Sequence, residues 1–443
     1  MKIIVKKVEL VCPAKNMKAV KAALPFADSI YFGVKKFNMR MKSENFSIQE
    51  MNDLVTLCHK NGINAYLTTN ILIYENELQE LHEVLDAAKK AEIDAVLVHD
   101  LASIQAAKEK GIPFHVSTQC NISNSIAAKF YESLGASKLI LARECSLKQI
   151  KEIKSKIKTE IEIFVHGAMC TAVSGRCYLS QYCSGSDKKS ANRGRCEQPC
   201  RREWRVFDEE GHEFIYDGVR FMNSRDLCMV TYIPEIIEAG VDALKIEGRM
   251  RDPFYVHVVS SIYREAIEAY YSGSFSKKKA KNWRKELAKV YNRGMTTGFY
   301  FHRPTEVDHQ HKSATNLSHF RLIELGKILS YDEKTHISLV QITNGYLKEG
   351  MPIVIMGGTY SDTFFTQNVK NLQKEGIKIT NSGLADVKHP LQLTIELIEP
   401  AESGELDSIF YFTDETYKRR IDLKKKQKKS KKIISKNDYY KLK

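Results

Sequence analysis

Eight short runs rich in β-branched and aromatic residues recur along the first 250 residues, and helix-forming segments lie between most of them. The segment 77–91, for example, repeats its apolar residues every three or four positions, which is typical of an amphipathic helix. Alternating strands and helices indicate a parallel sheet with crossover helices, and eight strands favour a (β/α)8 barrel of the TIM type. The runs are Val8–Val11, Ser29–Phe32, Ala65–Thr69, Ala95–His99, Phe114–Ser117, Leu139–Ala142, Ile161–Val165 and Ala243–Ile246.

An open doubly wound sheet is the weaker interpretation, because no glycine-rich dinucleotide fingerprint follows any of the runs. We expect the barrel to occupy residues 1–275. The seventh and eighth runs are farther apart than a plain loop requires, which predicts a cysteine-rich insertion at about 167–225. This insertion is expected at the C-terminal face of the barrel, where barrel enzymes carry their active sites. After the eighth run, Asp252 and Pro253 predict the start of a helix that continues to Tyr271.

The pattern changes in the last third of the chain. A helical linker is expected over 276–314. From about residue 320 apolar residues alternate with polar ones, and the turn pairs Asn344-Gly345 and Gly357-Gly358 separate the short runs. Alternation with period two is typical of strands with one buried face. We therefore expect a small antiparallel β-barrel over 315–413.

The net charge of +14 is concentrated at the C-terminus, where residues 418–443 hold 13 Lys or Arg and two acidic residues. We expect a basic, disordered tail over 414–443, which is either a solubilising extension or an arm for RNA phosphates. No stretch approaches the roughly 20 apolar residues that span a bilayer. Charge also returns after three residues in Met1–Lys7, unlike in a signal peptide. We expect a cytoplasmic protein without a membrane partner.

Four of the five cysteines in the expected insertion have the spacing C-x6-C-x18-C-x3-C, namely Cys170, Cys177, Cys196 and Cys200. Dense thiols in a reducing compartment more often hold a metal or an iron–sulfur cluster than form disulfides. A structural zinc site usually has two pairs of closely spaced cysteines, and this segment has one such pair, Cys196 and Cys200. The loose spacing suits a cluster at least as well, and scattered buried thiols remain the alternative. Neighbouring arginines lower thiol pKa values and equally suit RNA phosphates.

Polar residues gather where several of the predicted strands end. Converging Arg, Lys and Gln side chains suit a small carboxylate substrate, with arginine as a bidentate clamp. The alternative is a set of polar contacts that only close the barrel mouth. A Cys170–His166 nucleophile pair is a further interpretation, which competes for the same thiol. The strand-end residues are Asn38, Arg40, His115, Gln119, His166, Lys245, Glu247 and Arg249.

Several long motifs resemble the collagenase-like peptidase family U-32. The longest begins at Glu162 and includes His166-Gly167-Ala168-Met169-Cys170 and Ser174-Gly175-Arg176-Cys177. The others are His115–Gln119, Leu141–Glu144, Asn223–Cys228, Ile233–Glu235, Lys245–Met250 and Arg293–Gly298, so that the resemblance covers residues 5–300.

The resemblance implies more than the peptidase label. Relatives in this family bind a [4Fe–4S] cluster through cysteines and support oxygen insertion. One branch forms 5-hydroxyuridine at the wobble position of tRNA in a prephenate-dependent manner, and another hydroxylates a cytidine of large-subunit rRNA. The two-domain size of this chain favours the tRNA branch, with collagenase-like peptidase and rRNA hydroxylation as alternatives.

The resemblance also implies roles for individual residues. The cluster ligands are expected at Cys170, Cys177, Cys196 and Cys200, with Cys183 and Cys228 as substitutes. We expect His166, Glu247 and Arg249 to act in catalysis, and Arg40, His115, Gln119 and Lys245 to bind the substrate. The expected partners are tRNA and a small carboxylate, prephenate.

Overall fold

The computed structural model describes residues 7–173, 176–213, 220 and 222–414. They form two compact units, divided between Leu317 and Ser318. The tail expected beyond Asp414 and the motif residues Ser174 and Gly175 lie outside the described residues.

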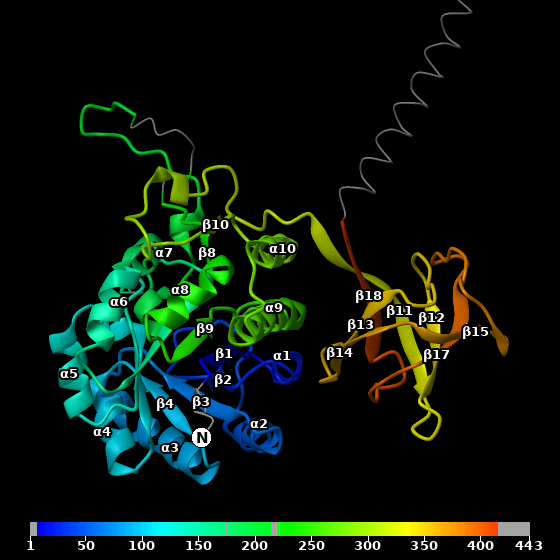
Figure 1. Cartoon of the computed structure of the whole chain (residues 1–443), viewed down its shortest axis with the longest axis horizontal. Helices are drawn as coiled ribbons and strands as arrows, with labels where there is room; N and C mark the ends of the chain where they lie inside the picture. Colours follow the sequence, from blue (N-terminus) through cyan, green and yellow to red (C-terminus); the bar gives the residue numbers. More distant parts are fainter. Residues whose placement is uncertain (1–6, 174–175, 214–219, 221, 415–443) are drawn as a thin grey trace, which may run out of the picture. The chain divides into compact units, whose positions relative to one another are not determined.

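The first unit is a closed parallel barrel, as the eight runs predicted. Strand β7 pairs with β9 and β9 with β1, which joins the two ends of the sheet. Figure 1 shows the helices around the outside of these strands. The barrel strands are β1 (Glu9–Pro13), β2 (Ser29–Phe32), β3 (Asn64–Thr69), β4 (Ala95–Val98), β5 (Phe114–Val116), β6 (Lys138–Ile140), β7 (Glu160–Ala168) and β9 (Ala243–Ile246).

Short polar residues begin six of the eight barrel helices, because their side chains accept hydrogen bonds from backbone N–H groups of the first turn. Ser47 and Glu50 form a capping box at α2, and Asp252 accepts from the Tyr255 N–H at α9, where the helix start was predicted. The barrel helices are α1 (Met17–Ala23), α2 (Ile48–Lys60), α3 (Leu78–Lys90), α4 (Leu101–Glu109), α5 (Ser125–Ser133), α6 (Leu147–Lys154), α8 (Ile233–Glu238) and α9 (Pro253–Tyr271).

The segment between β7 and β9 contains the helix α7 (Leu179–Ser184) and the strand β8 (Asp226–Cys228). Strand β8 runs antiparallel to the last residues of β7, and β10 (Met295–Thr296) pairs with β8. The stretch expected as a linker therefore holds α10 (Lys277–Leu287) and β10, both within the first unit. Trp283 and Leu287 bury the apolar face of α10.

The second unit is an antiparallel half-barrel sheet with the strand order β14-β13-β18-β11-β12-β17-β15-β16. Its inward residues alternate along the strands, as in β12, where Ser338, Val340 and Ile342 are buried. Its strands are β11 (Phe320–Tyr331), β12 (Ile337–Ile342), β13 (Pro352–Gly357), β14 (Phe364–Asn368), β15 (Lys370–Lys374), β16 (Ile377–Lys378), β17 (Leu391–Glu396) and β18 (Asp407–Asp414). No helix among the described residues is long and apolar enough to span a membrane.

Candidate active site at the barrel mouth

The barrel interior is unusually polar below its mouth. Lys245 of β9 donates to Glu162 of β7 at 2.7 Å, and both side chains are buried. Deeper in the barrel, Lys138 of β6 pairs with Glu9 of β1. Burying single charges is strongly unfavourable, so both of these lysines are held beside carboxylates. The interior thus holds fixed charges directly beneath the mouth.

At the mouth, Arg40 and Glu247 form an ion pair between the loops that follow β2 and β9. Arg40 donates to Glu247 Oε1 through Nε at 3.1 Å and through Nη2 at 3.0 Å. Burial acts to raise the pKa of Glu247, but Arg40 and Arg143 outweigh it and hold that pKa below its usual range. The Glu247 carboxylate is therefore ionised, and its charge is compensated by Arg40.

Arg249 is a buried cation that no carboxylate of the described residues contacts directly. It donates to Thr68 Oγ1 and to Asn38 Oδ1, each at 3.0 Å, and to Asn45. Its buried Nε has no hydrogen-bond partner among the described residues. Burial lowers the pKa of Arg249 to about 10, so it is still protonated at neutral pH.

Arg143, like Arg249, has a buried Nε without a hydrogen-bond partner in the described part of the chain. Its Nη1 donates to the Ala168 carbonyl at 2.9 Å, and its guanidinium lies 4.1 Å from the centre of the Phe164 ring. Arg143 and Arg249 both line a small inner cavity of about 30 Å³. Two guanidiniums, each with a buried and unused Nε donor, make this cavity suited to an anionic group.

A larger outer cavity of about 240 Å³ lies against the inner one, and both are lined by Arg40, Gln119, Arg143 and Glu247. Gln119 is held by Ser117, which donates to its amide oxygen. All four cysteines of the predicted ligand set line the outer cavity: Cys170, Cys177, Cys196 and Cys200. Residues separated by 30 positions in sequence thus share one cavity with the charged barrel mouth.

The four thiols are close enough to influence one another's ionisation. Burial raises the pKa of Cys177 and of Cys200, and Cys170 and Cys196 raise both further, because neighbouring thiolates repel. Arg201 acts in the opposite direction on Cys200. A positively charged group among the thiols would offset this repulsion.

The remaining two cysteines of the predicted set lie elsewhere. Cys183 is exposed on α7, and Cys228 is buried on β8, where Tyr263 is near enough to affect its pKa. Neither lines the outer cavity. Among the described residues, no group of three or more His, Cys, Asp or Glu is arranged to hold a single metal ion. A cubane cluster separates its thiolates more widely, because each one binds a different iron.

Two of the predicted catalytic and substrate-binding residues line neither cavity. His115 is buried on β5 against the Tyr66 ring, 4.6 Å between ring centres, and burial holds its pKa well below the usual range. His166 faces the helix α9, where its Nδ1 lies 3.4 Å from the Tyr263 hydroxyl. The reason is a register shift between β7 and β9: Phe164 pairs with Lys245, but His166 pairs with the outward residue Ile246.

The strand-end reasoning missed four arginines of the outer cavity, namely Arg143, Arg201, Arg251 and Arg293. Arg143 follows the sixth predicted strand directly, which is a signal of the same kind as that used for Gln119. Arg201 donates to Asn223 Oδ1 at 2.8 Å, and Arg293 donates to Asp226 Oδ1 through Nη2 at 2.6 Å. The first contact joins two parts of the insertion that are 22 residues apart, and the second joins β8 to a segment 67 residues further along the chain. No local pattern predicts such contacts.

The family model for peptidase family U32 matches residues 15–310, which is two thirds of the chain. The chain belongs to peptidase family U32. The U32 motifs named from the sequence include the cavity residues Cys170, Cys177, Glu247 and Arg293.

Three curated relatives of this U32 protein carry different names. An uncharacterized protease of Methanocaldococcus jannaschii is 42% identical over 80% of this chain and 87% of its own length. A collagenase of Porphyromonas gingivalis is 37% identical over 79% of this chain and 87% of its own length. The tRNA hydroxylation protein P1 of Bacillus subtilis is 33% identical over 88% of this chain and 92% of its own length.

Proposed function

We propose that this protein modifies RNA by hydroxylating C5 of the wobble uridine of tRNA, which forms 5-hydroxyuridine. The observation that carries the proposal is the outer cavity, in which four cysteines adjoin a mouth lined by arginines. The relative from Bacillus subtilis, named a tRNA hydroxylation protein, matches across both units of the chain. We place the reaction in the cytoplasm, where tRNA is found.

The residues fit a [4Fe–4S] cluster. Cys170, Cys177, Cys196 and Cys200 would hold it, because four mutually repelling thiolates with a nearby Arg201 form a suitable donor set. When bound, such a cluster supplies one-electron chemistry. Gly194 supports the ligand loop: its φ is +70°, and a Cβ there would meet the Asn38 carbonyl oxygen at 2.1 Å.

The inner cavity would bind the carboxylate of a small co-substrate, for which we propose prephenate. Arg143 and Arg249 supply unused Nε donors there, and Gln119 supplies a polar contact at the boundary between the two cavities. Arg40 is already engaged with Glu247, so it fixes that carboxylate rather than an added anion. Binding here excludes water from the mouth and holds the co-substrate against the outer cavity.

Glu247 is the carboxylate available for proton transfer at the mouth, since it lines both cavities. His166 is a positioning residue in this proposal: its carbonyl oxygen accepts the Glu247 N–H at 2.9 Å and so fixes the start of the loop that carries Glu247 and Arg249. Lys245 and His115 act beneath the mouth, where they set its charge and shape.

A collagenase-like peptidase is the second candidate, favoured by the name of the Porphyromonas gingivalis relative. The described lining of the outer cavity holds no histidine, and its single carboxylate is engaged with Arg40. A cysteine nucleophile paired with His166 is also disfavoured, because that imidazole faces α9. Hydroxylation of an rRNA cytidine is the alternative within the RNA-modifying class.

Nucleoside mass spectrometry tests the proposal. Deleting the gene should remove 5-hydroxyuridine and its derivatives from tRNA, in a strain without a redundant paralogue. A plasmid copy with Cys183→Ser should restore the nucleoside, and a copy with Cys196→Ser should not. Unchanged 5-hydroxyuridine, together with loss of 5-hydroxycytidine from rRNA, would favour the rRNA reaction. Unchanged nucleosides with gelatin cleavage by the purified protein would favour the peptidase.

A further inference from the structure

The helix α7 presents two different faces at the rim of the outer cavity. Leu179 and Ser180 line the cavity beside Cys177. The opposite face carries Tyr178 and Tyr182, which are 74% and 86% exposed. The Tyr182 N–H donates to the Tyr178 carbonyl at 2.8 Å, so the two residues lie one helical turn apart on the same face. Two exposed phenol rings therefore stand next to the cavity.

Two exposed tyrosine rings beside a cavity indicate a surface that binds a ligand or partner. Moving the apolar faces of a tyrosine ring out of water lowers the free energy. The two exposed rings of this short helix instead leave their apolar surface in contact with water. Contiguous exposed aromatic groups at the edge of a cavity are typical of a recognition surface. The chemistry of the surrounding side chains then decides which kind of ligand fits.

The surroundings are strongly basic. Residues 167–205 contain eight Lys or Arg and three acidic residues. Arg176, which precedes Cys177, is exposed and contacts His99 Nε2 at 3.2 Å. Burial and Arg176 itself lower the pKa of His99, so this partner is neutral and does not offset the arginine charge. Two of the acidic residues are themselves paired, Glu197 with Lys42 and Glu203 with Arg220.

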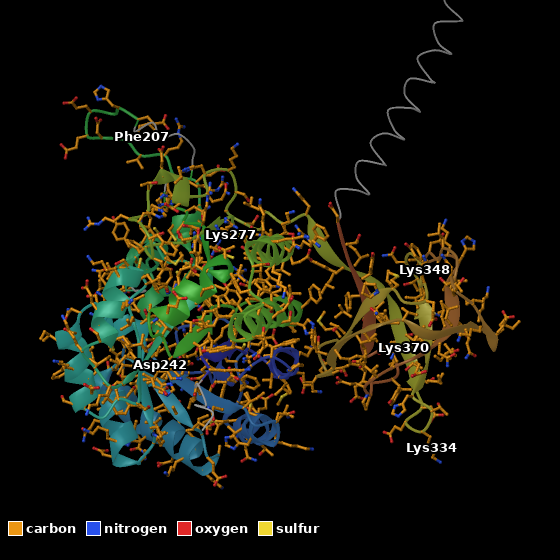
Figure 2. The ribbon with its side chains drawn as sticks, in the orientation of Figure 1. Phe207, Asp242, Lys277, Lys334, Lys348 and Lys370 are labelled. Atoms are coloured by element: carbon orange, nitrogen blue, oxygen red, sulfur yellow. The ribbon has the colours of Figure 1, made fainter. Side chains whose placement is uncertain are left out.

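The second unit offers no comparable surface within its described residues. Residues 318–414 contain eight Lys or Arg but 13 Asp or Glu. Its lysines are also dispersed: Figure 2 shows Lys334, Lys348 and Lys370 at separate places on the unit. The insertion of the first unit is thus the better place for a polyanion.

We propose that Tyr178 and Tyr182 form a stacking platform for unpaired bases of an RNA strand that enters the outer cavity. This inference rests on the proposed function and names the surface that binds its RNA. Unpaired loop bases are the parts of RNA that stack on aromatic side chains, while Arg and Lys neutralise the adjoining phosphates. A base that reacts inside a cavity has to leave its own stack, and the platform holds its neighbours.

Fluorescence anisotropy with the full-length protein tests this inference. The probes are a labelled single-stranded oligouridine and a labelled RNA duplex of equal length. Tyr178→Ala and Tyr182→Ala should each weaken binding of the single strand by about 5- to 150-fold, the loss expected for one stacked base. Tyr178→Phe and Tyr182→Phe should bind like the wild type, because phenylalanine keeps the stacking face. Duplex binding should change little.

Tyr360→Ala is the matched control, since Tyr360 is 88% exposed on the second unit. It should leave the affinity unchanged, and circular dichroism should show that every variant is folded. Wild-type affinity in both alanine variants would overturn the platform but not the proposed function, as long as the wild type binds the single strand and the gene deletion removes 5-hydroxyuridine. Failure of the wild type to bind oligouridine or transcribed tRNA would overturn both.

Discussion

Lys245 and Glu162 form a 2.7 Å ion pair inside the barrel, between the neighbouring strands β9 and β7. Their side chains are 3% and 0% exposed, and the second oxygen of Glu162 has no hydrogen-bond partner among the described residues. Burial lowers the pKa of Lys245, and Glu162 opposes that change. The pair is therefore held by mutual compensation in a place where neither charge is stable alone.

Glu162→Gln should destabilise the barrel because it leaves Lys245 without its counter-charge. Loss of one partner of a buried pair typically lowers the free energy of unfolding by about 3–5 kcal/mol. Urea unfolding followed by circular dichroism measures this change. Glu286→Gln, which breaks an exposed contact with Lys289, should lower it by less than about 1 kcal/mol. Equal losses in the two variants would contradict the interpretation.

The stability of the barrel should fall in acid partly because of His166. Burial lowers the pKa of His166 from 6.5 to about 4. A lowered pKa means that the unfolded chain binds the proton first, so this contribution is complete above pH 6.5 and is lost as the pH falls through 4. Its size is on the order of 3 kcal/mol.

His166→Asn should therefore make the free energy of unfolding less dependent on pH between 6.5 and 4, although His115 and half-buried His257 keep part of the slope. Urea titrations at several pH values measure the slope. His82→Gln, a half-buried histidine on α3, is the control. The same slope in wild type and His166→Asn would exclude this role.

The cysteines of the outer cavity should differ from their neighbours in iron binding. Protein purified without oxygen should contain about four irons and show broad visible absorbance from thiolate-to-iron charge transfer. Cys170→Ser and Cys196→Ser should lose both signals, because each removes a cluster ligand. Cys183→Ser is the matched control, since this exposed thiol lies six residues from Cys177 and outside the cavity. Stoichiometric zinc without iron would rule the cluster out.

Arg143 and Arg249 should determine affinity for the small carboxylate. Arg143→Met and Arg249→Met each remove a charge-assisted donor from the inner cavity, which should weaken prephenate binding by about 10- to 150-fold. Isothermal titration calorimetry measures the affinity. Arg205→Met removes an exposed arginine that pairs with Glu213, so it should bind prephenate like the wild type. Unchanged affinity in the first two variants would place the anion elsewhere.

Much of the fold follows from local patterns. All eight predicted runs correspond to barrel strands, because a strand buried on both faces needs an apolar stretch bounded by turn and capping residues. The antiparallel strands of the second unit were also predicted from the sequence, because apolar and polar residues that alternate with period two indicate strands with one buried face. Strand ends also predicted Gln119, Glu247 and Arg249 at the mouth, as the carboxyl ends of parallel strands meet on one face.

The sequence by itself therefore determined the barrel, the order of its elements and the residue types at its mouth, because these depend on periodicity and chain direction. Only the tertiary structure decided which residues face the cavity. The register shift between β7 and β9 turns His166 outward, and it depends on pairing between segments about 80 residues apart. Likewise, the insertion brings Cys170 and Cys200 to one cavity through long-range contacts, such as that of Arg201 with Asn223. Side-chain direction changes with a single step of register, and no local pattern encodes that step.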